Sequence, residues 1–589
     1  MKKIYLTLIF CGFFFNAKSQ DFKYRPADYE YLSAPDSLGI RHQILMPNLS
    51  NRSVNAIPKL PYPIIFIHGL NSGAHVWGNE GDTNDMNDVL TSYGLTFGGR
   101  FDFNLNDDNN NLTSNKIFYP NSGSDIAQYY TSVINADFYF LNFAVGSDGS
   151  YNPSDLSSLN VLSNEAAIAK QGVALAKAIQ QVMNITGRDK VILFGHSMGG
   201  LCAREYLQNP QNWTEPNVNH HIAKLITTGT PHGGYTGANF IFTGINSSSE
   251  AYRDLRTEYS NNNIGAFLFG GTESSSNIGT SYYNNDINCN GINNDGTTII
   301  GLNNKSLPTN EVDFAYIMGN CDGCLLSQGL IPGDGVVRLI NANLSNFTTN
   351  TLPSPKNEFI YTASAITEIH SDLPKAISVN MQALDEPNQL WLAYGVEYDI
   401  TYKGFIYNQP ENGYIYDYDD YKFTVTNNSI VNILINNITS STLSARIFDI
   451  NGTQIGNTYS GNLSNPINIS QLLSPGDYYL EIYGTPVDIS IIKSYNFNLS
   501  STLTSENFTH QSSIKAYPNP FTNQLTIESN ELIYKVEIYN LLGQKVKNIL
   551  FNNTTENSIN IDLSELAQGN YIAKVSSESF INTIKLIKN

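Results

Sequence analysis

Residues 191–200 of the chain read VILFGHSMGG. The first four residues are an apolar run of the length that a buried strand requires, and an apolar pattern with helical spacing resumes after Ser197. A Gly-x-Ser-x-Gly motif between a strand and a helix makes a tight turn that lifts the serine hydroxyl above the sheet, and Gly195 and Gly199 leave room for that turn. We therefore expect Ser197 to be a nucleophile at the carboxyl end of a strand.

The flanking sequence alternates further strand and helix patterns. Residues 63–67 and 138–145 read as buried strands, and residues 163–183 carry apolar residues at helical spacing. This alternation predicts an α/β layer fold, a mostly parallel sheet flanked by helices, over about residues 20–390. Two long segments, about 97–135 and 235–330, read as insertions, and either is a candidate lid over a substrate pocket.

A serine nucleophile needs a base, and in this kind of fold the acid and then the histidine follow the serine along the chain. Of the histidines after Ser197, His370 is placed best, because it follows a predicted strand at 358–362 and precedes a helical stretch. The others are His220, His221, His232 and His510. Asp334, between two glycines, is the preferred acid; its competitors are Asp254, Asp286, Asp295, Asp313 and Asp322.

The oxyanion of an acyl-transfer intermediate needs two N–H donors. Met198 begins the predicted helix after the nucleophile, so its N–H and the helix dipole point at the developing charge. The second expected donor is the N–H of Leu70, in the loop after the strand at 63–67. His68 precedes the serine in the chain and is expected to support that loop.

Five segments carry a resemblance to a known family: IIFIHGLNSGAHVWG, FGHSMGGLCAREYL, LITTGTPHGG, GDGVV and EIHSDLPKA. They resemble the α/β-hydrolase lipases and the related GPI-inositol-deacylase-like esterases, over about residues 60–390. The resemblance implies an ester or lipid substrate, hydrolysis through an acyl-enzyme and no required cofactor. It implies Ser197 as nucleophile, His370 as base and then acid, and Asp334 as the orienting carboxylate.

Calcium and disulfides are expected features of the second insertion. Asp286, Asn288 and Asn290 are spaced like ligands of a calcium loop, with glycine at the sixth position, but the glutamate expected at the twelfth is absent. A structural Ca²⁺ there is a candidate. Export makes disulfides plausible among Cys289, Cys321 and Cys324, with a bond from Cys289 stapling the insertion. Cys202 is expected to be a small buried residue.

Residues 395–500 alternate apolar and polar positions between frequent turns, which predicts an all-β sandwich. The segments DYDDYKF and LSPGDYYL resemble the bacterial pre-peptidase C-terminal domain, an accessory module of secreted hydrolases. The module is either a spacer or a binder of substrate or cell-surface glycan. Its acidic residues Asp417, Asp419 and Asp420 are expected to be solvated turn carboxylates, with Ca²⁺ binding as the alternative.

Both ends of the chain predict export. Residues 1–19 read as a signal peptide, with Lys2 and Lys3, an apolar run and a small-x-small box. Residues 501–513 read as a linker, and 514–589 as a second all-β sandwich. The YPNPF opening, VEIYNLLGQKV and GNYIAKV resemble the type A sorting domain of the type IX secretion system, which implies passage across the outer membrane and release or surface attachment.

Composition narrows the functional classes. The 589 residues carry a formal charge of −19, which disfavours nucleic acid as a partner, and 41% hydrophobic residues, which exclude global disorder. After the leader there is no run of about 18 apolar residues that could span a membrane. The leading hypothesis is a secreted serine esterase or lipase; the alternatives are a carbohydrate esterase acting on polysaccharide and a non-catalytic surface adhesin.

Overall fold

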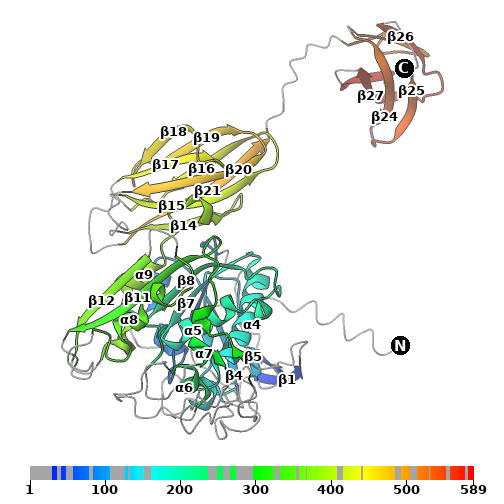
Figure 1. Ribbon diagram of the computed structural model, residues 1–589. Coiled ribbons are helices and arrows are strands. Elements are labelled where there is room, and N and C mark those ends of the chain that lie inside the picture. The colour runs from blue at the N-terminus through cyan, green and yellow to red at the C-terminus, as the bar shows by residue number, and fades with distance from the viewer. Residues whose placement is uncertain are drawn as a thin grey trace, which may run out of the picture. The chain divides into compact units, whose positions relative to one another are not determined.

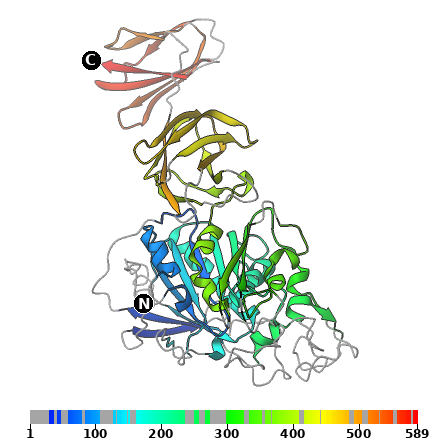
Figure 2. The ribbon, with the colours of Figure 1, turned by 90° about the vertical axis from the view of Figure 1, so that its left-hand side faces the viewer.

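The structure is a computed structural model. It describes residues 29–35, 41–47, 58–78, 84–105, 126–130, 133–146, 149–151, 161–235, 249–256, 266–272, 296, 298–322, 324, 332–352, 357–365, 368–407, 416–439, 442–484, 492–503, 514–529, 531–551, 557–577 and 581–589. The predicted signal peptide lies outside these residues. The chain divides into two compact units, Met1–Leu503 and Thr504–Asn589, and the colours of Figures 1 and 2 trace them along the sequence.

The first unit begins with a ten-stranded sheet. Its strands, in spatial order, are β1 (Tyr29–Pro35), β2 (Arg41–Pro47), β5 (Ile126–Tyr130), β4 (Phe97–Leu105), β6 (Phe138–Asn142), β3 (Ile64–Ile67), β7 (Val191–His196), β8 (Ile222–Thr228), β11 (Asp313–Asp322) and β12 (Asn357–Ser364). From β4 to β12 every neighbouring pair is parallel, so the predicted mostly parallel sheet is confirmed. Both predicted insertions are partly wrong, because β4 and β5 of the first and β11 of the second lie within the sheet.

Successive side chains of the central strands point to opposite faces of the sheet, and both faces are apolar. Ile64 and Phe66 of β3 contribute to one core, while Ile65 and Ile67 contribute to the other. The second core packs beneath α4 (Ile168–Thr186) and α5 (Met198–Gln208). The first packs against α2 (Met86–Ser92) and α9 (Ile377–Ala383). Such strands must be apolar on both faces, which explains their nearly continuous hydrophobic runs.

Shorter elements complete this region. The remaining α-helices are α3 (Val161–Asn164), α6 (Glu250–Asp254), α7 (Ala266–Phe269) and α8 (Leu339–Ala342). The 3₁₀ segments are η3 (Ala74–Trp77), η7 (Pro210–Asn212), η8 (Leu302–Asn304), η9 (Leu344–Asn346), η10 (His370–Lys375) and η11 (Leu390–Leu392), and β9 (Gly271–Thr272) pairs with β10 (Thr298–Ile299). Among the described helices none is both long and apolar enough to cross a membrane.

Two mostly antiparallel sheets follow within the same unit, with β13 and β15 as a parallel pair. One contains β13 (Tyr394–Gly395), β15 (Asp417–Val425), β20 (Gly476–Gly484), β17 (Leu443–Asp449) and β18 (Gln454–Gly461); the other contains β14 (Thr401–Ile406), β21 (Lys493–Leu503), β16 (Ser429–Asn436) and β19 (Ile467–Leu473). Their inward residues join the same apolar core as β3 and α9. Arg188 of the α/β region also donates a 3.0 Å hydrogen bond to the Tyr402 hydroxyl of β14.

The second unit is all β. Its sheets contain β22 (Lys515–Tyr517), β23 (Gln524–Glu528) and β26 (Ser558–Asp562), and β25 (Lys545–Leu550), β24 (Ile533–Asn540), β27 (Gly569–Ser577) and β28 (Ile581–Lys588). A separate apolar core that includes Phe521, Val536 and Leu586 lies between them. The unit therefore has its own hydrophobic interior.

Candidate active site

The carboxyl ends of four parallel strands bring the predicted site residues together. Ser197 follows β7, Asp334 follows β11 and His370 follows β12, while Leu70 follows β3. Figure 1 shows β7, β8, β11 and β12 side by side. Parallel strands end at one edge of a sheet, which is where open α/β sheets place their ligands.

Ser197 lies on a tight turn with φ 53° and ψ −126°, a conformation that non-glycine residues rarely adopt. Both glycines of the motif are required by close contacts. A Cβ on Gly195 would lie 2.4 Å from the amide nitrogen of Gly200, and one on Gly199 would lie 2.5 Å from the carbonyl oxygen of Ile67. Any larger side chain would push the turn away from β3.

His370 links the serine to the acid. Its Nε2 lies 2.9 Å from Ser197 Oγ, and its Nδ1 lies 2.7 Å from Asp334 Oδ2. Because a carboxylate only accepts hydrogen bonds, Nδ1 carries the proton and Nε2 is free to accept the hydroxyl proton of the serine. The sequence-predicted serine, histidine and aspartate are therefore joined in one hydrogen-bonded chain.

Asp334 is fully buried and held by its own loop. Its Oδ1 accepts hydrogen bonds from the amides of Val336 and Val337, at 2.9 and 2.7 Å. These bonds aim Oδ2 at the imidazole of His370. Burial alone would lower the pKa of His370, but the negative charge of Asp334 and the hydrogen bond to it more than offset that effect and raise the pKa.

The candidate oxyanion donors flank the serine. Met198 is the first residue of α5, where backbone N–H groups lack intrahelical acceptors, and Leu70 packs against the apolar cluster that contains Met198. The strand leading to Leu70 approaches closely, because a Cβ on Gly69 would lie 2.6 Å from the Cβ of Ser197. Both predicted donors are thus carried by segments that contact the nucleophile turn.

His68 has the supporting position expected from the sequence. It is fully buried, and burial lowers its pKa to about 3, so it is neutral. The amide of Phe143 donates to its Nε2 at 2.9 Å, which leaves the proton on Nδ1 to be donated to the carbonyl of Gly69, also at 2.9 Å. The ring therefore ties the loop after β3 to the end of β6.

The competing residues have other contacts. His232 lies between Arg204 Nη1 and Thr227 Oγ1, 3.1 Å from each. Asp254 accepts from the amide of Ile168, and Asp313 pairs with Lys224. Asp286, Asp295 and His510 lie outside the described residues.

The predicted calcium loop and one predicted disulfide partner cannot be placed. Asp286, Asn288, Asn290 and Cys289 lie outside the described residues. Cys321 and Cys324 are bonded to each other, which is one of the pairings that the sequence left open, and this excludes a bond from Cys289 to either of them. The two cysteines are three positions apart in the sequence, so the bridge closes a short segment and does not staple the insertion. Cys202 is free and buried, as expected.

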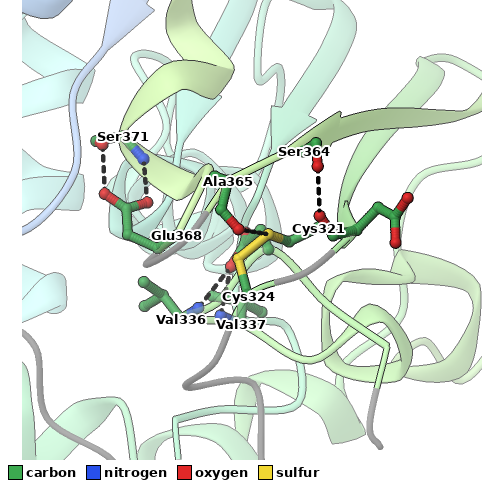
Figure 3. The surroundings of a disulfide bond; sticks show 10 residues. Cys321, Cys324, Val336, Val337, Ser364, Ala365, Glu368 and Ser371 are labelled. Carbon is green, nitrogen blue, oxygen red and sulfur yellow. Dashed lines mark hydrogen bonds between the residues drawn. A yellow bond between two sulfur atoms is a disulfide. The ribbon is translucent and has the colours of Figure 1, made fainter. Parts of the chain in front are cut away.

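Figure 3 shows the disulfide beside both loops of the site. Cys321 Sγ lies 3.8 Å from the carbonyl oxygen of Ala365, which follows β12, and the amide of Cys321 donates to Gly333. Val336 and Val337, whose amides bind Asp334, lie in the same view. The bridge therefore contacts the loop that carries the acid and the loop that leads to the histidine.

Comparison with known proteins supports two parts of this description. A family model for the alpha/beta hydrolase fold matches residues 153–311, and one for a secretion system C-terminal sorting domain matches residues 515–589. The comparison with curated proteins found no match. The chain therefore has an α/β-hydrolase fold, which supports a hydrolase, and its sorting domain implies export to the surface or the medium.

The solved structures that the comparison matched have low sequence identity to this chain. A gene product of Listeria innocua is 14% identical, with 56% of this chain and 95% of that chain covered and a TM-score of 0.28. Lipase BlEst2 of Bacillus licheniformis is 17% identical, with 56% and 94% covered and a TM-score of 0.27. The pre-peptidase C-terminal domain of a Bacillus anthracis collagenase is 19% identical, with 20% and 99% covered and a TM-score of 0.16. The narrower resemblance to GPI-inositol-deacylase-like esterases stays a prediction.

Proposed function

We propose that the protein is an exported serine hydrolase that cleaves carboxylic esters through an acyl-enzyme. The observation that carries the proposal is the chain of two hydrogen bonds, from Ser197 Oγ to His370 Nε2 at 2.9 Å and from His370 Nδ1 to Asp334 Oδ2 at 2.7 Å. A base with its proton on Nδ1 is oriented to accept the serine proton as the hydroxyl attacks.

The reaction has two halves. Ser197 Oγ bonds to the ester carbonyl carbon while His370 takes its proton, and the amides of Met198 and Leu70 stabilise the resulting oxyanion. The intermediate collapses as His370 gives the proton to the leaving alcohol, which leaves an acyl group on Ser197. Water, deprotonated by His370, then attacks the acyl carbon and releases the acid.

Asp334 acts through the histidine. Its buried carboxylate holds the imidazole in the tautomer that accepts at Nε2 and stabilises the imidazolium that forms during each half. The hydrogen bonds from Val336 and Val337 keep the carboxylate ready for that role. No cofactor is needed for these steps.

Labelling with a fluorophosphonate tests the nucleophile. We expect the full chain to be labelled and to hydrolyse p-nitrophenyl esters, and we expect Ser197→Ala to lose both. Hydrolysis that falls steeply beyond medium acyl chains would identify an esterase, whereas activation by emulsified triglyceride would identify a lipase. Release of acetate from acetylated polysaccharide, without activity on the simple esters, would favour a carbohydrate esterase.

A wild-type chain that is folded but is neither labelled nor active on any ester would contradict the proposal. Circular dichroism of both proteins is the control for folding. In that outcome a non-catalytic role for the fold, such as adhesion, would become the better interpretation.

A further inference from the structure

A cluster of carboxylates lies where the α/β region meets the first β-sandwich, outside the candidate active site. Asp385 follows α9, and Asp417 and Asp419 lie on β15. Each offers an oxygen that lies within 4.8 Å of those of the other two. Residues two apart on a strand share a face, and this face of β15 is the buried one. Asp420 is buried as well, so the expectation that Asp417, Asp419 and Asp420 are solvated turn residues is wrong.

The cluster contains buried carboxylate oxygens without partners. Asp419 is fully buried, and neighbouring Glu386 is 6% exposed. Among the described residues, no hydrogen-bond partner reaches Asp385 Oδ1, Glu386 Oε2 or Asp419 Oδ1. An ionised oxygen removed from water is costly unless a donor or a cation compensates it. These three oxygens are therefore available as ligands of a cation.

The neighbouring charges do not compensate the cluster. Lys224 is the cation nearest to it in the described part of the chain, and its Nζ pairs with Asp313 at 2.8 Å. The same Nζ donates to the backbone carbonyl of Asp385. The other donors to the cluster are neutral: the hydroxyls of Tyr421 and Tyr495 and the amide of Tyr407. In the described part of the chain, these four carboxyl groups therefore share one neighbouring cation, which is already paired with Asp313.

A buried hydroxyl lies beside the same carboxyl groups. Tyr407 is 3% exposed, and its hydroxyl has no partner among the described residues. Tyr407 lines the same cavity as Glu386, and its amide donates a 2.7 Å hydrogen bond to Asp417 Oδ2, so the residue lies beside these carboxyl groups. Unpartnered oxygens of two chemical kinds thus face the same place.

We propose that Asp385, Asp417 and Asp419, with Glu386 and Tyr407 beside them, bind a calcium ion. The ligand atoms are all oxygens, with no histidine or cysteine among them, and several are carboxylates, which is the donor set of a hard divalent cation. Calcium fits better than magnesium, because it accepts six to eight oxygens in irregular geometry, whereas magnesium usually keeps several waters.

The ion would join two parts of the chain that are far apart in sequence. One set of ligands follows α9, the helix directly after the segment that carries His370, and the other set belongs to β15. Calcium would therefore fasten the end of the α/β region to the sandwich. This inference does not depend on the proposed esterase activity, because none of these residues contacts Ser197, Asp334 or His370 in the hydrogen bonds described above.

Terbium luminescence and thermal unfolding of the full chain test the site. After treatment with a chelator, we expect Tb³⁺ to bind with emission sensitised by excitation of the nearby tyrosines, and Ca²⁺ to displace it. Calcium at about one hundred times its Kd should raise the Tm of the first unit by roughly 3 °C. A protein whose Tm is unchanged by calcium and that sensitises no Tb³⁺ emission would overturn the proposal and indicate carboxyl groups that share protons instead.

Three variants locate the ion. Asp419→Asn should abolish the calcium effect, whereas Asp420→Asn, which changes the adjacent and opposite-facing residue of β15, should retain it. Asp286→Asn should also retain it; loss there, with retention in Asp419→Asn, would place the ion in the calcium loop predicted from the sequence and overturn the proposal. In chelator, Asp419→Asn should melt at or above the wild-type temperature, because a neutral amide replaces one of several carboxyl groups buried close together. A folding defect cannot produce that result. If it does not fold, the partly exposed Asp385→Asn provides the same comparison.

Discussion

His196 Nε2 donates a 3.0 Å hydrogen bond to the backbone carbonyl of His370. The two ring centroids lie 4.9 Å apart. Because His196 is the last residue of β7 and directly precedes Ser197, the end of one strand presents the serine and also holds the backbone of the histidine that faces it. Burial, and then the charge of His370, keeps the pKa of His196 well below its ordinary value, so its ring is a neutral donor.

Replacing His196 with alanine should lower kcat by about 10- to 100-fold with little change in KM, because the base would lose its fixed position without loss of a substrate contact. Steady-state kinetics on a p-nitrophenyl ester measure both constants. His196→Gln, which keeps an N–H donor, should recover part of the loss. A change confined to KM, or equal losses in the two variants, would contradict this positioning role.

Asp334→Asn should reduce kcat by about 10⁴-fold, because an amide at that position can donate to Nδ1 and favour the wrong imidazole tautomer. The amides of Val336 and Val337 would still fix the side chain, so the fold should be retained. Asp254→Asn is a matched buried control and should leave kcat within a few fold. An unchanged kcat in Asp334→Asn would mean that another residue is the acid.

The pH dependence should follow His370. Only the neutral imidazole can accept the serine proton, so kcat/KM should fall as the pH drops through the pKa of this residue. Because Asp334 raises that pKa, the midpoint should lie above the ordinary value of about 6.5 for histidine. In Asp334→Asn the midpoint of the residual activity should move to lower pH. A shift in the opposite direction would rule out Asp334 as the source of the raised pKa.

Removal of the Cys321–Cys324 bridge should cost about 2 kcal/mol at most, because the closed segment is short. A double serine variant, compared by urea unfolding, measures this cost. We expect a larger proportional effect on kcat, since the bridge contacts the loops of Asp334 and His370. Cys202→Ala, at a free cysteine behind Ser197, controls for the loss of a thiol. An unaltered kcat would show that these loops hold their positions without the bridge.

A chain that stops at Leu503 should keep its activity in vitro and lose its export. The division between the two compact units falls after this residue, and residues 515–589 match the sorting-domain model. Assays of cell fractions and culture medium would locate the product. Normal release of the shortened chain would contradict the role of the second unit in export.

The sequence predicted the site well because short motifs report local constraints. The turn at Ser197 needs glycines, and the acid loop needs amides that bind Asp334; both needs are visible in adjacent residues. The order of the motifs along the chain then indicated His370. The strand at 358–362 was predicted within β12 for the same reason, since an apolar run between loop segments is a local pattern.

Features that depend on three-dimensional neighbours were not predictable in the same way. The contact between His196 and His370 joins residues 174 positions apart. The carboxylates of β15 look like a polar turn in sequence, yet they are buried and lie close to Asp385, more than 30 positions earlier in the chain. The signal was present in the sequence of β15: Asp417 and Asp419 fall on the same side of the strand as the apolar residues Tyr421 and Phe423. That alternation would have indicated that the two carboxyl groups face inward.

The position of β12 has a consequence for how the protein loses activity. This strand is the last of the described sheet and pairs with β11 alone, yet it leads directly to His370. Edge elements can detach in local openings that need less free energy than global unfolding. In mild denaturant, ester hydrolysis should therefore disappear before the cores melt, so that the catalytic rate reports the fraying of one strand while circular dichroism still records a folded chain.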